Sequence, residues 1–152
     1  MKAVIQRVKR ASVTVDGKVT GACGRGLAVL LGVALGDTEQ DASLLAAKIS
    51  KLRIFRDENG KMNLSVNDIS GDIVVVSQFT LLANYAHGNR PDYLNAAPPE
   101  EADRLYEFFK RELGSMISGK VSSGVFGADM TFEIINEGPV TIVMDSEALK
   151  KK

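Results

Sequence analysis

The tetrapeptide Ser77-Gln78-Phe79-Thr80 carries three hydrogen-bonding side chains directly after the apolar run Ile73–Val76. Two of the three are hydroxyls, which act as nucleophiles when a neighbouring base accepts their proton. The only histidine in the chain, His87, lies in a separate polar stretch. A catalytic triad is therefore not indicated, and oriented hydrogen bonds that stabilise developing charge are favoured. The structural alternative is that Ser and Thr cap the exit of a strand into a loop.

Three further segments are candidates, and each is weak alone. Gly138-Pro139 lies between two apolar runs and is typical of a turn; the cis isomer occurs in about one X-Pro bond in twenty. In Gly88-Asn89-Arg90-Pro91, Arg90 is suited to phosphate and Asn89 to a ribose or base edge, although a solvated turn is the ordinary interpretation. Phe126-Gly127-Ala128-Asp129-Met130 carries an aromatic ring and a thioether, which form either a core wall or a stacking pocket for a base.

The composition limits the function further. Lys plus Arg and Asp plus Glu number 19 each, so the chain lacks the basic excess of proteins that coat nucleic-acid backbone, and an RNA partner would touch a small part of the surface. One His and one Cys cannot form a zinc site, and no acidic cluster has calcium-loop spacing, so no metal is expected. The single Cys23 excludes an internal disulfide. Without a signal-like or membrane-spanning apolar run, we expect a cytoplasmic protein that does not contact a membrane.

The elements that must position these residues begin with strands. Ala3–Val8 and Ala11–Val15 alternate polar and apolar residues, and Asp16-Gly17 is a two-residue hairpin signal before Lys18–Thr20. The continuous apolar run Leu27–Val33 is typical of a strand buried on both faces. Later strands are predicted at Val121–Phe126, Thr131–Asn136 and Val140–Met144, with a turn at Asn136–Pro139 between the last two.

Two helices are predicted from apolar residues at helical spacing. We expect Asp37 to cap the first, with Gln40 three residues on. Its buried stripe would be Ala42, Leu45, Ala46, Ile49 and Leu52. The second helix has Pro99 in its first turn and closes at Gly114. Its stripe would be Ala102, Leu105, Tyr106, Phe109 and Leu113.

The order of these elements predicts a single mixed α/β domain over residues 1–146. Its largest sheet face must be covered by the two helices or by a partner chain. Asn84–Pro99 is rich in Pro, Asn and Gly and is interpreted as a functional loop. Residues 147–152 are expected to form a frayed, solvated tail.

Taken together, segments along nearly the whole chain resemble one family, the D-aminoacyl-tRNA deacylases, once called D-tyrosyl-tRNA deacylases. Any one segment is weak, but their order and spacing are specific. The matching segments are Ala3–Val8, Leu52–Phe55, Gly60–Asn63, Val76–Leu81, Gly88–Pro91, Phe126–Met130 and Gly138–Thr141.

The resemblance implies a largely antiparallel, barrel-like sheet with two covering helices, built as two strands, two helix–strand units and three strands. It implies a homodimer that hydrolyses the ester between a D-amino acid and the terminal adenosine of tRNA, without a metal or organic cofactor. Ser77, Gln78, Phe79 and Thr80 match one hallmark motif. Gly138-Pro139 matches the other, which is a cis pair that enters the partner's pocket.

Further expectations follow from the resemblance. Rigid carbonyls of Gly138-Pro139 would hold the α-ammonium and exclude an L side chain by clash, with Arg7 locking the pair from below. Glycine has no side chain to exclude, so glycyl-tRNA should also be cleaved. Phe79, Phe126 and Met130 would hold the terminal adenine. Water would be activated either by Thr80 or by the 2′-hydroxyl of the substrate, and the sequence does not choose between them.

This chain departs from the family pattern in one loop. Ala86 and His87 stand where the family has two basic residues, and Asp92-Tyr93 follows Arg90-Pro91 where Ser-Phe is usual. Phosphate contact through this loop is therefore left open. The isomer of the Gly138-Pro139 bond is also open, since a related branch with a trans bond has altered chiral selectivity.

The alternative function is a non-catalytic nucleic-acid-binding relative of the same fold. Some such relatives carry long C-terminal extensions, whereas this chain ends about eight residues after Met144 with balanced charge, which favours the enzyme. Sequence does not predict the preferred D-amino acid or tRNA.

Overall fold

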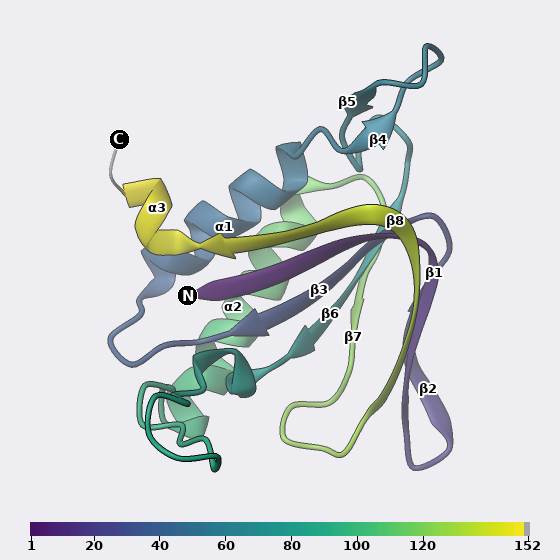
Figure 1. Cartoon of the computed structure of the whole chain (residues 1–152). Coiled ribbons are helices and arrows are strands. Elements are labelled where there is room, and N and C mark those ends of the chain that lie inside the picture. Colours follow the sequence, from purple (N-terminus) through teal and green to yellow (C-terminus); the bar gives the residue numbers. More distant parts are fainter. Residues whose placement is uncertain (151–152) are drawn as a thin grey trace.

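One long N-terminal strand organises the sheet of this protein, whose computed structural model describes residues 1–150 (Figure 1). β1 (Lys2–Val15) pairs antiparallel with β8 (Thr131–Asp145) along one edge. Along its other edge β1 pairs first with β3 (Gly26–Gly32) and then with β2 (Lys18–Cys23), also antiparallel. The hairpin between β1 and β2 turns at Asp16-Gly17, both with positive φ as a type I′ turn requires, so that prediction is confirmed.

The sheet continues from β3 through two parallel strands, β6 (Asp72–Ser77) and β7 (Val121–Ser123), in the order β2-β1-β3-β6-β7. It curls until its ends meet, where Ser122 Oγ accepts a hydrogen bond from the Ala22 backbone N–H at 3.1 Å. The mixed, largely antiparallel, barrel-like fold is therefore confirmed. A separate hairpin, β4 (Phe55–Arg56) with β5 (Met62–Leu64), projects away from the sheet (Figure 1).

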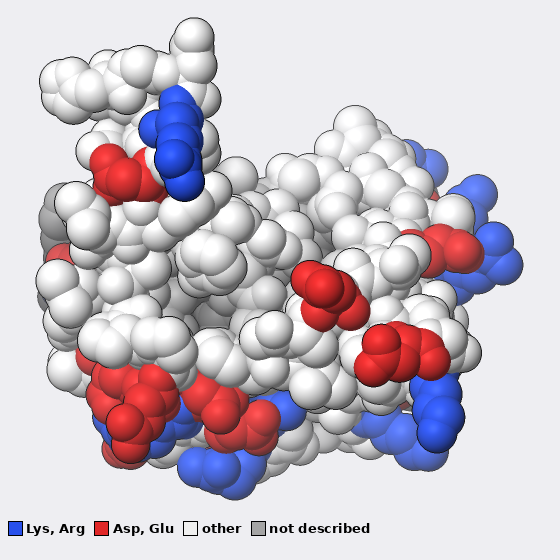
Figure 2. Space-filling model, turned by 90° about the horizontal axis from the view of Figure 1, so that it is seen from below, with Lys and Arg blue, Asp and Glu red and all other residues white. Residues whose placement is uncertain are grey.

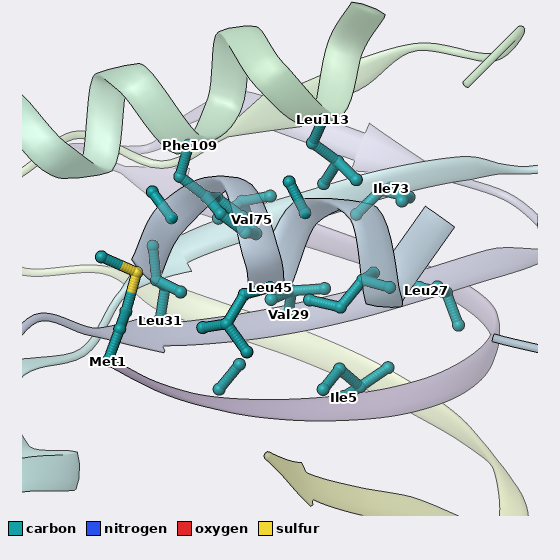
Figure 3. Packing of buried hydrophobic residues seen from close by; sticks show 14 of the residues in the cluster. Met1, Ile5, Leu27, Val29, Leu31, Leu45, Ile73, Val75, Phe109 and Leu113 are labelled. Carbon is teal, nitrogen blue, oxygen red and sulfur yellow. The ribbon is translucent and has the colours of Figure 1, made fainter. Parts of the chain in front are cut away.

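The two predicted helices cover one face of the sheet and form the core (Figures 1 and 3). They are α1 (Glu39–Lys51) and α2 (Pro99–Met116). The predicted α2 stripe is buried throughout, and so is the α1 stripe except Leu52, which is half-buried just beyond the helix. β3, between β1 and β6, is buried along nearly its whole length, as its apolar run predicts. No helix within residues 1–150 combines the length and apolar character needed to cross a membrane.

Three predicted boundaries are wrong. Thr38, not Asp37, caps α1 in a capping box with Asp41. The carboxylate of Asp37 instead accepts the Ala34 N–H at 2.7 Å and contacts the Met1 ammonium at 2.8 Å. α2 runs past Gly114 to Met116, and β7 ends at Ser123 rather than reaching Phe126.

The predicted turn at Asn136–Pro139 is wrong as well, since β8 is one continuous strand. Its pairing register with β1 shifts there, from Gln6 opposite Thr141 to Val8 opposite Asn136. The extra residues form a bulge. Asn136 Nδ2 holds it by donating to the carbonyls of Arg7 and Val140 at 2.9 and 3.0 Å.

The expected frayed tail is also corrected over its described part. Ser146–Lys150 form a short helix, α3. Lys150 Nζ lies 2.7 Å from the buried Asp41 carboxylate and 2.8 Å from Glu147. Burial opposes ionisation of Asp41, but hydrogen bonds from Lys150, Ser146 and the Thr38 N–H outweigh it and lower its pKa well below the ordinary range. Residues 151 and 152 lie outside the described residues.

Candidate functional site

A cavity of about 860 Å³ opens where β6 ends. Its walls come from the end of β6, the start of α2, the loop before it and the loop between β7 and β8. Figure 2 shows a hollow in the middle of this face. The lining residues are Leu35, Val76, Ser77, Gln78, Phe79, Tyr93, Leu94, Ala96, Ala97, Pro98, Pro99, Ala102, Phe126, Gly127, Ala128, Asp129, Met130 and Phe132.

The predicted tetrapeptide lies at the edge of this cavity. Ser77 is the last residue of β6, opposite Leu31 of β3, and the Gln78 N–H donates to the Leu31 carbonyl at 2.7 Å. The chain then turns into a short 3₁₀ helix, η1 (Phe79–Leu82). Gln78 Nε2 donates to Thr80 Oγ1. Ser77, Gln78 and Phe79 line the cavity, whereas Thr80 does not and is joined to its lining by the hydrogen bond from Gln78.

Aromatic and sulfur-bearing side chains form the apolar wall. Phe79 is 56% exposed and meets Tyr93 edge-on, with ring centroids 5.0 Å apart. Phe126 and Met130 also line the cavity. The cavity therefore brings Phe79 together with Phe126 and Met130, which lie about fifty residues later in the sequence.

Phe126 is supported from below by Tyr106 of α2, at 6.0 Å between ring centroids. The Tyr106 hydroxyl donates to the Val75 carbonyl of β6 at 3.0 Å. Burial raises the pKa of Tyr106 to about 12, so this hydroxyl keeps its proton at neutral pH. The Tyr106 side chain thus links the strand that ends at Ser77 to a ring that lines the cavity.

The cavity lining carries little charge. Asp129 is its acidic residue, and none of the Lys, Arg, His or Cys residues among the described residues 1–150 lines it. In Figure 2 the surface around the hollow is uncharged, and most of the charged groups nearest to it are acidic. Within residues 1–150, no three or more His, Cys, Asp or Glu side chains lie close enough to hold a metal ion. Oriented hydroxyl, amide and backbone groups are therefore what this lining offers a reacting ester.

Asn89 and Arg90 do not line the cavity. They are exposed on a loop whose base is closed by two backbone hydrogen bonds between Asn84 and Asp92, at 2.8 and 2.9 Å. Arg90 precedes Tyr93 by three residues, so the loop that carries it leads directly into the cavity wall.

Arg7, Gly138 and Pro139 gather at the opposite end of the sheet. Arg7 is only 1% exposed, and its guanidinium donates to the carbonyls of Ile54 and Glu137 at 2.8 and 3.3 Å. Its Nε also lies 3.5 Å from the Glu137 carboxylate. The Gly138-Pro139 bond is cis, and both residues are exposed.

The strand register separates this second group from the cavity. β3 places Leu31 beside Ser77 and Leu27 beside Arg7. Four residues of strand span about 13 Å. Gly138 and Pro139 accordingly do not line the cavity of their own chain.

Several lining residues escaped the sequence-based prediction. Leu35 follows β3, and Tyr93, Leu94 and Pro98 lie in the segment that was predicted only as a functional loop. Exposed Leu35 and Leu94 were the available signal, because large apolar side chains in a polar stretch indicate a surface with a function.

Comparisons with known proteins agree with one another. The family model described as D-Tyr-tRNA(Tyr) deacylase matches residues 4–145. The D-aminoacyl-tRNA deacylase of Akkermansia muciniphila is 55% identical, covering 96% of this chain and 97% of its own, and that of Anaeromyxobacter dehalogenans is 57% identical, covering 98% and 99%. A solved structure named c-Myc DNA Unwinding Element Binding Protein has a TM-score of 0.90 at 46% identity, covering 95% and 98%. A probable eukaryotic D-amino acid tRNA deacylase shares the fold, with a TM-score of 0.79 at 17% identity over 94% and 97%.

Proposed function

Because the chain belongs to the D-Tyr-tRNA(Tyr) deacylase family and is a D-aminoacyl-tRNA deacylase, we propose that its cavity binds the terminal aminoacyl-adenosine of tRNA and hydrolyses the ester there. The observation that supports this proposal is the cavity. It joins hydrogen-bonding groups at Ser77 and Gln78 to an aromatic and thioether wall large enough for an adenine ring. The reaction uses no metal or organic cofactor and takes place in the cytoplasm, where tRNA is charged.

A second copy of the chain distinguishes D- from L-amino acids on the substrate. Gly138 and Pro139 are exposed, lie at the other end of the sheet from their own cavity and are held by the buried Arg7 through the Glu137 carbonyl. In a homodimer each Gly138-Pro139 pair enters the partner's cavity. Its backbone oxygens hold the α-ammonium and leave no space for an L side chain, so discrimination rests on exclusion rather than on attraction.

The adenine lies among Phe79, Phe126 and Met130, and stacking on such side chains tolerates any base. Asn89 and Arg90 contact the RNA beyond the terminal adenosine. Both are exposed on the loop that leads to Tyr93 in the cavity wall.

The attacking water is activated by the 2′-hydroxyl of the substrate. Thr80 does not line the cavity, and it acts by orienting Gln78. Thr80→Ala should therefore retain substantial activity. Complete loss in a folded protein would instead assign Thr80 as nucleophile or base.

The decisive experiment measures hydrolysis of D-tyrosyl-, L-tyrosyl- and glycyl-tRNA by the purified protein. We expect D-tyrosyl- and glycyl-tRNA to be cleaved and L-tyrosyl-tRNA to be spared. Equal rates on the two tyrosyl enantiomers, or cleavage of neither, would overturn the proposal. Resistance of glycyl-tRNA at high enzyme concentration would contradict a pocket that selects by exclusion.

A second candidate function is nucleic-acid binding without catalysis. It is favoured by the likeness to the c-Myc DNA unwinding element binding protein at 46% identity. Tight binding of duplex DNA by a protein that cleaves no aminoacyl-tRNA would support it.

A further inference from the structure

The proposed substrate is the end of a polyanionic tRNA. Over the part of the chain that the structure describes, however, no Lys or Arg lines the cavity that receives it. Asp129 lies in that lining, and Glu100 lies in the first turn of α2, whose start forms part of the cavity wall. Phosphate groups on the strand that leads into the cavity gain affinity chiefly from Lys and Arg. Arg90, three residues before Tyr93 of the wall, is one cation near the cavity, and cations from another part of the protein would strengthen the binding of this strand.

The β4–β5 hairpin carries such charge. Arg53, Arg56 and Lys61 are exposed on it or next to it. Arg25 lies against its base, with its guanidinium carbon 5.6 Å from the centre of the Phe55 ring. The acidic Asp57 is held inside the turn, where it accepts the N–H groups of Asn59 and Lys61 at 2.9 and 3.0 Å.

The four cations are anchored to different degrees. Arg53 is fixed, since its Nε donates to the Asn63 carbonyl at 2.9 Å. Within residues 1–150, the side chains of Arg56 and Lys61 make no hydrogen bond or ion pair with the protein. Their charges are therefore available to an external anion, and their removal should leave the fold intact.

Arg7 connects this hairpin to Gly138-Pro139. One guanidinium binds the carbonyl of Ile54, directly before β4, and the carbonyl of Glu137, directly before Gly138. Two residues of extended chain, from Ile54 to Arg56, span at most about 7 Å. Arg56 therefore lies near Gly138-Pro139, and a partner surface that receives this pair would have the hairpin close to it.

We propose that the β4–β5 hairpin of one subunit binds the phosphates of the tRNA acceptor strand that enters the cavity of the other subunit. The inference rests on the proposed function, because it requires Gly138-Pro139 to lie in the partner's cavity. Each active site is then composite: one chain supplies the cavity, and the partner supplies both the chiral check and the phosphate contacts. Arg56 and Lys61 are the residues that make these contacts.

The first test replaces both residues, as Arg56→Gln/Lys61→Gln. Lys18→Gln/Arg111→Gln is the matched control, since it removes the same charge from exposed positions elsewhere. KM and kcat are measured on D-tyrosyl-tRNA and on D-tyrosyl-adenosine, which has no phosphate. We expect the hairpin variant alone to raise KM for the tRNA roughly five- to tenfold, with the loss confined to that substrate.

Salt dependence gives an independent measurement. Loss of two phosphate contacts should reduce the slope of log KM against log salt by about 1.4. If the hairpin variant has the same slope and the same KM as the control variant, the inference is overturned. The proposed function still stands in that case, provided that the wild-type protein is active. Absence of wild-type activity on both substrates would instead refute the proposed function.

The second test asks which subunit supplies the hairpin. A hybrid dimer joins one chain carrying Arg56→Gln/Lys61→Gln to one carrying Ala128→Trp, which fills the cavity and is first shown to be inactive alone. The one open cavity then faces an unaltered hairpin from its partner, and KM should equal the wild-type value. A raised KM would place the contacts within one chain, and a wild-type protein that stays monomeric would also overturn the inference.

Discussion

The two ends of the sheet differ in what stabilises them. At the cavity end, Ser77, Phe79 and Phe126 lie on apolar support, and one neutral hydroxyl, that of Tyr106, joins strand to helix. At the other end a buried cation, Arg7, binds two carbonyls and a carboxylate. The first end is hollow and nearly uncharged. The second presents exposed backbone and is flanked by cations.

The difference indicates which properties of the protein each end controls. A hollow lined by rings can be altered at its surface with little cost to folding, because its exposed side chains contribute little burial. Removing a buried guanidinium leaves its hydrogen-bond acceptors buried without a donor, which destabilises the fold. Changes at the cavity should therefore alter substrate binding. Changes at Arg7 should alter both the stability of the fold and the selectivity between D- and L-substrates.

The largest effect is expected for Arg7→Ala. The change leaves the carbonyls of Ile54 and Glu137 and the Glu137 carboxylate without their partner, which costs about 3–5 kcal/mol of unfolding free energy. Urea denaturation measures it. Selectivity between D- and L-tyrosyl-tRNA should fall as well, since Gly138 follows Glu137 directly.

Arg10→Ala is the matched control for Arg7→Ala. Arg10 lies three residues on in the same strand and pairs with Glu133 at 3.5 Å, but both side chains are exposed. Its loss should cost at most about 1 kcal/mol. If Arg7→Ala and Arg10→Ala lower the unfolding free energy equally, the burial of Arg7 is not what stabilises this end of the sheet.

Sequence patterns predicted the cavity end better than the Arg7 end, for a physical reason. The apolar runs of β3 and β6 and the stripe of α2 are local periodicities, and burial enforces them wherever they occur. The bulge in β8, at the Arg7 end, depends instead on a partner more than a hundred residues away. The α1 cap lies near the cavity end, and its prediction failed because Asp37 binds the chain terminus. Asn136 looked like a turn residue, yet it holds the bulge by binding Arg7 and Val140.

The cavity shows the same limit. Ser77–Phe79 were predicted because they follow a buried strand directly. Leu35, Tyr93 and Leu94 join them only because the loops after β3 and before α2 converge on that strand end. No local pattern encodes such convergence. The resemblance to a family supplied Phe126 and Met130, but it did not supply Leu35, Tyr93 or Leu94.

The second prediction concerns Phe79→Ala, which tests whether the cavity end controls binding. The ring is 56% exposed, so unfolding free energy should change by less than about 1 kcal/mol. Loss of a stacking surface for adenine should raise KM about tenfold with little change in kcat. Steady-state kinetics on D-tyrosyl-tRNA measure both constants.

Tyr85→Ala is the control for Phe79→Ala. Tyr85 is 80% exposed and does not line the cavity, so KM should stay at the wild-type value. A similar rise in both variants would show that any exposed aromatic ring of this face contributes and that the cavity wall is not special.

The smallest effect is expected for Tyr106→Phe, which keeps the ring against Phe126 and removes only the hydroxyl. The Val75 carbonyl still accepts the Gly124 N–H at 3.2 Å, so the change should cost about 1 kcal/mol at neutral pH. Burial raises the pKa of Tyr106 to about 12. When the folded-state pKa of a tyrosine is raised, the group adds to the free energy of unfolding at pH values below its unfolded pKa near 10. This contribution is lost as pH rises from about 10 to 12.

Tyr106→Phe should therefore reduce the loss of unfolding free energy at alkaline pH, whereas Tyr85→Phe should not. Urea titrations at pH 8 and pH 11 measure the difference. If Tyr106→Phe leaves the alkaline loss unchanged, a titrating group other than Tyr106 causes it, and the contrast between the cavity end and the Arg7 end is weaker than the geometry indicates.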